Sequence, residues 1–128
     1  MNDKEFVEKV RDRPEMFGLD RTYHPTAMLL LGYDLASSGG VLRGFTEWLV
    51  VRKGECSSLV WFALVLEDAV PGVVLRNPRQ IEPEHQEQAV EHLFRLVLAF
   101  LDMRDDKREL AAMYARYDRM NSSFYGTS

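Results

Sequence analysis

The sequence predicts an all-α protein, a single-domain bundle of five or six helices. Apolar residues recur every three or four positions through most of the chain, which is the spacing of one helix face. Proline, glycine and serine interrupt this pattern where helices would begin and end. A chain of 128 residues is also the usual size of one domain with one core. We therefore expect residues 1–128 to form one helical domain.

The first expected helix starts behind Asn2 or Asp3, either of which can cap the exposed amides of a first turn. It should end near Arg13, because Pro14 pushes the residue before it out of the α region. Its apolar face consists of Phe6, Val7 and Val10.

A second helix is expected to start at Pro25, since a missing amide hydrogen costs nothing in a first turn. The run Ser37-Ser38-Gly39-Gly40 should end it. Its repeating residues are Ala27, Leu30, Leu31, Asp34 and Leu35.

A third helix should end at Gly54, and its apolar stripe is Leu42, Phe45, Trp48 and Leu49. Residues 59–66 are eight apolar residues in a row, which suit a buried helix or a buried strand. We favour a helix, because Ser57 can cap it and residues 67–69 extend it past strand length. A strand would make the fold α+β. Residues 73–75 could form a short extended piece.

The clearest helix begins at Pro83 and should be the central core helix. Its apolar residues are Val90, Leu93, Phe94, Val97, Leu98 and Leu101. A final helix follows Asp106, which with Glu109 resembles a capping box. It continues through Leu110, Met113, Tyr114 and Tyr117, and residues 121–128 are expected to be a flexible tail.

Composition narrows the range of functions that this chain can have. The formal net charge of -4 disfavours binding of nucleic acid, because no overall positive field holds a polyanion. Cys56 is the single cysteine, so no internal disulfide can form, and a reducing cytoplasm is expected. The first 13 residues contain no apolar leader segment, and no apolar run approaches the roughly 20 residues that span a bilayer. We expect no membrane anchor.

No recognisable active site appears, and we expect no catalytic residue, cofactor or metal. Cys56 has no nucleophile signature around it, and residues 38–40 lack the spacing and the lysine of a phosphate-binding loop. His85 and His92 lie two helical turns apart, about 10 Å, which is too far to chelate one ion. We expect both to face solvent, and His24 to cap the second helix.

Carboxylates gather near both ends of the long helix. Helix dipoles favour such residues at the first turn, so the group can be plain solvated surface. The alternative is an acidic docking patch for a basic partner, in which charges steer association. The candidate partner-binding residues are Glu82, Glu84, Glu87, Glu91, Asp102, Asp105 and Asp106.

Residues 10–18 read Val-Arg-Asp-Arg-Pro-Glu-Met-Phe-Gly and resemble a segment in the ATPase region of type II topoisomerase subunits. That family's later motifs are missing, because Gly32-Tyr33-Asp34 stands where its acidic-and-asparagine motif belongs and no Asp-x-Gly-x-Gly follows. We therefore reject nucleotide hydrolysis.

A broader resemblance is to small bacterial proteins with an Arg-Pro-x-Met-Tyr/Phe start and a Gly-Phe-x-x-Trp-Leu helix, some of which look like toxin-immunity proteins. The matching segments are residues 13–18, 31–34 and 44–49, with 59–61 a weaker fourth. This implies a shared fold. The same residues have structural interpretations, in which Met16 and Phe17 plug the core and Gly32 permits a close helix crossing.

Three functions remain open. The first is a non-enzymatic immunity or antitoxin-like protein that covers a basic toxin with its acidic surface. The second is an enzyme or small-molecule binder with a pocket lined by Trp61, Tyr33 or Tyr114. The third is a helical adaptor or homodimer, whose aromatic anchor would be Trp48 or the group Tyr114, Tyr117, Phe124 and Tyr125.

Overall fold

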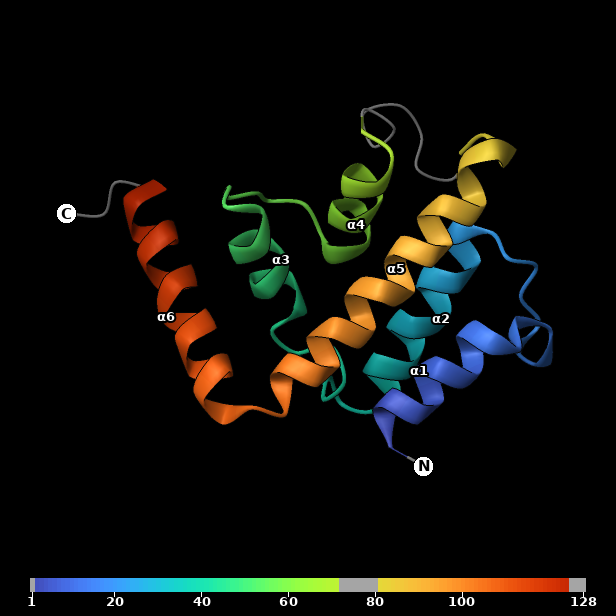
Figure 1. Cartoon of the computed structure of the whole chain (residues 1–128), viewed down its shortest axis with the longest axis horizontal. Coiled ribbons are helices and arrows are strands. Elements are labelled where there is room, and N and C mark those ends of the chain that lie inside the picture. Colours follow the sequence, from blue (N-terminus) through green and yellow to red (C-terminus); the bar gives the residue numbers. More distant parts are fainter. Residues whose placement is uncertain (1, 72–80, 125–128) are drawn as a thin grey trace.

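The computed structural model describes residues 2–71 and 81–124 (Figure 1). Within these ranges all regular structure is helical, which confirms the predicted all-α fold. The helices are α1 (Asp3–Asp12), the short 3₁₀ helix η1 (Pro14–Phe17), α2 (Tyr23–Ala36), α3 (Phe45–Lys53), α4 (Trp61–Ala69), α5 (Pro83–Arg104) and α6 (Lys107–Phe124). The expected extended piece at 73–75 lies outside the described residues.

Helix α5 is the central element, as predicted. It packs against α1, α2, α3, α4 and α6. Figure 1 shows it running diagonally through the molecule, with α1 and α2 on one side and α3 and α6 at the opposite end. Because α5 has neighbours all around, it buries residues on more than one face: Ala89, Leu93, Phe94, Leu96, Val97, Phe100 and Leu101.

An aromatic cluster fills the core between α3, α4 and α5. The Phe45 ring lies 5.2 Å from that of Phe100 and 5.7 Å from that of Trp61, measured between centroids. Trp48 lies 5.9 Å from Phe100 and stacks on Phe45. Such contacts contribute packing energy beyond the area that the rings bury. Trp48 is therefore a core contact in this chain, and the structure gives no support to its predicted role as a dimer anchor.

Residues 59–66 contribute to a helix, as favoured from sequence, but α4 begins later than expected. Val60 is its N-cap residue and Trp61 its first helical residue. Ser57 is not the cap, because its hydroxyl accepts a hydrogen bond from the Leu59 amide in the preceding loop. Helix α2 starts at Tyr23, so Pro25 is its third residue and His24 lies inside the first turn rather than capping it.

Helix α6 begins with the predicted cap. The Asp106 carboxylate accepts hydrogen bonds from the amides of Arg108 and Glu109, at 3.0 and 3.2 Å. The helix continues to Phe124, so residues 121–124 are helical rather than part of a tail. Met113 is its buried anchor.

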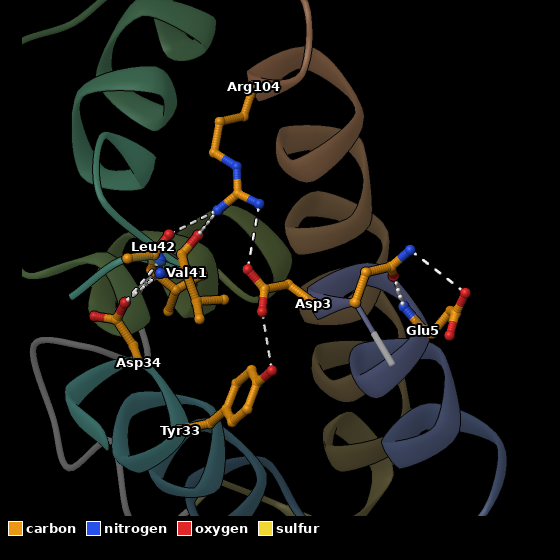
Figure 2. A network of polar contacts seen from close by, with 9 residues as sticks. Asp3, Glu5, Tyr33, Asp34, Val41, Leu42 and Arg104 are labelled. Carbon is orange, nitrogen blue, oxygen red and sulfur yellow. Dashed lines mark hydrogen bonds and ion pairs between the residues drawn. The ribbon is translucent and has the colours of Figure 1, made fainter. Parts of the chain in front are cut away.

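The loop between α2 and α3 is held by two charged side chains (Figure 2). Asp34 accepts hydrogen bonds from the amides of Val41 and Leu42, at 3.1 and 2.7 Å. Arg104 donates to the carbonyl oxygens of Gly40 and Val41, at 2.9 and 2.7 Å. Arg104 also pairs with Asp3. The loop backbone is thereby satisfied on both its donor and its acceptor side.

The segment after α1 turns tightly, but one predicted contact there is wrong. Phe17 packs edge-on against Phe6, with centroids 5.6 Å apart, as the predicted core plug requires. Met16, predicted to share this role, is 63% exposed. A single 3₁₀ turn directs consecutive side chains to different sides, so Phe17 and Met16 cannot both face the core.

Among the described residues, no helix combines the length and the apolar character that crossing a membrane requires.

Candidate functional site

A groove of about 1180 Å³ runs along α5. One wall is α5 itself, lined from Pro83 to Asp102, a length of about 28 Å. The other wall comes from the end of α1, from η1, from the loop that leads into α2 and from the first turn of α2. The residues on that side are Arg11, Asp12, Pro14, Leu19, Asp20, Arg21, Thr22 and Thr26.

The floor of the groove is apolar. Val90, Phe94 and Leu98 line it from α5, four residues apart, and Leu19 lines it from the other wall. Val90 and Leu98, which the periodicity assigns to the core, are only half-buried. Their apolar surface is available in the groove, which is the area that a bound partner would remove from water.

A row of polar side chains runs beside this floor. Glu87, Glu91 and Arg95 follow one another at four-residue intervals on α5 and line the groove. Glu87 and Glu91 therefore lie about one turn apart, with Cβ atoms roughly 6 Å from each other. Within residues 2–71 and 81–124, neither carboxylate takes part in an ion pair.

The other carboxylates of the groove already have partners. Asp102 forms an ion pair with Lys4, at 2.8 Å between carboxylate oxygen and Nζ. The Asp12 carboxylate accepts a hydrogen bond from the Arg11 side chain, which lowers its pKa. Thr22 lowers the pKa of Asp20 in the same way. Glu87 and Glu91 are thus the carboxylates of this groove that are left for a ligand.

The structure divides the seven acidic residues singled out from sequence. Glu87, Glu91 and Asp102 line the groove. Glu82 and Glu84 lie at the start of α5, outside the groove. Asp105 and Asp106 lie beyond the last residue of α5. About 33 Å of helix separates the two ends of α5, so these two groups do not lie side by side.

Sequence reasoning did not find the wall opposite α5. Arg21 stands there with a backbone φ of +66°, a conformation that residues other than glycine rarely adopt. Nothing in the sequence around residue 21 predicts this conformation. Arg11 and Arg21 belong to segments that meet α5 only in the folded chain.

A second polar cluster joins α3, α4 and α5 away from the groove. The Asp68 carboxylate accepts from Arg52, at 3.2 Å, and lies 2.5 Å from His92 Nε2. The His92 side chain is only 14% exposed, so the prediction that it faces solvent is wrong. The reason is that its face of α5 is covered by the end of α4. The His85 side chain is 38% exposed, although its Nδ1 atom is buried without a partner among the described residues.

We expect Asp68 to make the free energy of unfolding depend on pH in the acidic range. Its partial burial raises the pKa, but the hydrogen bonds from His92 and Arg52 outweigh this, so the pKa lies below 3.8. The stabilisation is therefore present above about pH 4 and is lost as pH falls through the folded-state pKa. Chemical denaturation of wild type and Asp68→Asn should show a difference at about pH 6 that shrinks towards about pH 3. A difference that stays constant would contradict this assignment.

The aromatic residues proposed for a small-molecule pocket are not in the groove. Trp61 is buried in the core cluster. Tyr33 stacks on Phe6, and its hydroxyl donates to Asp3. Tyr114 packs against Gly44. The groove has a different lining, so these three residues do not support that hypothesis.

In the described part of the chain, Cys56 has no reactive partner, and the side chains that could bind a metal do not gather at one place. Cys56 is half-buried, and its sulfur lies 3.5 Å from the carbonyl oxygen of Met120. In residues 2–71 and 81–124, no three side chains among His, Cys, Asp and Glu are placed to share a metal ion.

Comparison with known proteins adds no match. No protein-family profile matches the chain. No curated protein and no solved structure is significantly similar to it. The resemblance to immunity proteins therefore stays a prediction, and the candidate site is argued from its own geometry.

Proposed function

We propose that this chain is a non-enzymatic protein-binding module, of the immunity or antitoxin type, which holds a basic segment of its partner in the groove along α5. The observation that carries the proposal is the pairing of Glu87 and Glu91, without ion-pair partners in the described chain, with the apolar floor beside them. Apolar area supplies binding energy, and the carboxylates select and steer a basic partner.

The dimensions of the groove favour a protein segment over a small molecule. Sites for small molecules are clefts or cavities of roughly 300–1,000 Å³. The groove is larger, at about 1180 Å³, and extends along nearly the whole of α5. A side-chain-bearing segment can follow that length, whereas a small molecule would leave most of it empty.

A basic toxin fits this charge layout. An enzyme that acts on nucleic acid presents a positively charged substrate surface. The net charge of -4 and the two groove carboxylates are complementary to such a surface. Covering it would keep the substrate away.

The test is a charge reversal at the groove. The probe is the purified product of the gene that lies beside the one for this chain, titrated by calorimetry. Glu87→Lys with Glu91→Lys is expected to weaken binding about 10- to 100-fold, because two attractive contacts become repulsive. Raising the salt concentration should weaken the wild-type complex and affect the variant less.

The matched control is Glu82→Lys with Glu84→Lys, which makes the same change in net charge on the same helix outside the groove. It should leave affinity within about threefold. If both double variants weaken binding equally, net charge and not the groove explains the interaction. If the neighbouring gene product does not bind, the immunity assignment fails.

A further inference from the structure

Arg21, in the groove wall opposite α5, occupies a backbone position that suits glycine better than arginine. Its φ of +66° strains any residue that carries a Cβ atom. The Arg21 side chain is exposed and lines the groove. It forms no ion pair and no hydrogen bond within residues 2–71 and 81–124. Contacts inside the described chain therefore give no reason for an arginine here, and its charge is left for a ligand.

The backbone around Arg21 is fixed by hydrogen bonds. The Asp20 carboxylate accepts from the amide and the hydroxyl of Thr22. The Tyr23 amide donates to Oε1 of Gln86, at 2.8 Å, which ties the first residue of α2 to the first turn of α5. Figure 1 shows this end of α2 beside the first turns of α5. Arg21 is thus held across the groove from the start of α5.

The carboxylates on the same wall already have partners. Asp20 is the neighbour of Arg21 in the chain, but its carboxylate accepts both hydrogen bonds from Thr22. The Asp12 carboxylate pairs with Arg11, at 2.8 Å. Arg21 therefore remains available to a carboxylate from outside the chain.

The two walls of the groove carry opposite charges. Glu87 and Glu91 line it from α5, and Arg21 lines it from the other side. Arg95 follows one turn beyond Glu91 and ends the acidic row, so this row is limited to the first half of α5. A segment that lies between the walls meets carboxylates along one flank and a guanidinium on the other.

The spacing and the length of the groove favour a helix as the occupant. Val90, Phe94 and Leu98 repeat along the floor every four residues, about 6 Å. A helix repeats apolar residues at nearly the same interval on one face, with polar residues on either side of them. The groove length of about 28 Å corresponds to about 19 helical residues.

We infer that the groove selects an amphipathic helix with opposite charges on its two flanks. Basic residues of that helix face Glu87 and Glu91, and apolar residues cover the floor. A carboxylate on the other flank binds the Arg21 guanidinium. This inference rests on the proposed function, because it needs a partner segment in the groove, and it adds the carboxylate that the segment must carry.

The experiment uses two synthetic helical peptides of about 19 residues. Both have an apolar stripe and two lysines one turn apart on one flank, and they carry two glutamates or two glutamines on the other flank. In fluorescence anisotropy at low salt, the wild-type chain should bind the glutamate peptide about three- to tenfold more tightly. The net charge of -4 alone would favour the glutamine peptide, which is the more positive, so overall charge cannot produce the expected order.

The test variant is Arg21→Gly. It should abolish the preference for the glutamate peptide, because the guanidinium is gone. It should also raise the melting temperature by about 1–4 °C, because glycine relieves the strain at a φ of +66°. Arg21→Lys should keep part of the preference, since an ammonium group attracts the carboxylate without the paired donors of a guanidinium.

Two controls separate strain and charge from the groove. Ser38→Gly relieves a similar strain, at a φ of +57°, outside the groove. It should raise the melting temperature and keep the preference. Arg116→Gln removes the same charge from α6, where the side chain is exposed and does not line the groove. It should also keep the preference.

Each remaining outcome counts against a stated claim. If the wild type binds both peptides equally, and Glu87→Lys with Glu91→Lys weakens both, the groove binds basic segments but the role of Arg21 is wrong. If the wild type binds neither peptide, the groove fails as a binding site and this inference fails with it. A lower melting temperature for Arg21→Gly, or a preference that is lost in either control, would also overturn the inference.

Discussion

Replacing Gly44 with alanine is expected to lower the free energy of unfolding by about 2–4 kcal/mol. Gly44 has a φ of +91°, which strains any residue with a side chain. In addition, the new Cβ would stand 2.5 Å from the Tyr114 hydroxyl oxygen and 3.3 Å from Cζ of the same ring. The Tyr114 ring must shift away from the start of α3. Urea denaturation measures the loss.

Gly54→Ala is the matched control, because Gly54 has a similar φ of +81° at the other end of α3 but open space around its Cβ position. It should cost only the backbone strain, about 1–2 kcal/mol. In the Gly44→Ala background, Tyr114→Phe should recover part of the loss by removing the closest atom. Equal costs for the two glycines would show that the Tyr114 contact contributes nothing.

The contact between Gly44 and Tyr114 gives a structural reason for the glycine of the Gly-Phe-x-x-Trp-Leu segment. Gly44 provides the left-handed turn and the space for Tyr114, while Phe45 and Trp48 stack in the core beside Phe100. Leu49 is buried as well. Each residue thus has a packing role. The segment contributes no residue to the groove.

The helices could be predicted because their signals are local. Pro83 starts α5, Asp106 caps α6, and Gly54 ends α3 in the left-handed conformation. Residues 59–66 were ambiguous because periodicity cannot separate a buried helix from a buried strand. In the structure residues 61–66 belong to α4, which packs against α5, whereas Leu59 and Val60 are exposed; a strand here would have no neighbouring strand among the described residues.

The groove could be predicted only in part, because its two walls are far apart in the sequence. Glu87 and Glu91 stood out as charges on a helix, but which of the carboxylates line the groove depends on the position of α1 and the loop after it. The exposure of Val90 and Leu98 could not be predicted from the sequence for the same reason. Apolar periodicity identifies a face of α5, and only the packing of α1, η1 and α2 decides which of its residues remain accessible.

Arg104→Met is expected to cost about 1.5–3 kcal/mol of the free energy of unfolding. Methionine keeps an apolar stem but removes the donors that hold the carbonyl oxygens of Gly40 and Val41. Val41 is only 2% exposed, so water replaces its lost hydrogen bond poorly. Arg104→Lys should recover only part of the loss, because an ammonium group lacks the planar fork of a guanidinium. Urea denaturation of the three proteins gives the comparison.

The loop carbonyls, and not the ion pair, should account for most of this cost. The Arg104–Asp3 pair is 3.3 Å long and partly exposed, with side chains 23% and 31% accessible. Pairs of this kind contribute about 0–1 kcal/mol. Asp3→Asn keeps an acceptor for the Tyr33 hydroxyl and should therefore cost less than half as much as Arg104→Met. If the two substitutions cost the same, the ion pair is the main contact, and Arg104 acts by holding α1 to α5 instead of fixing the loop before α3.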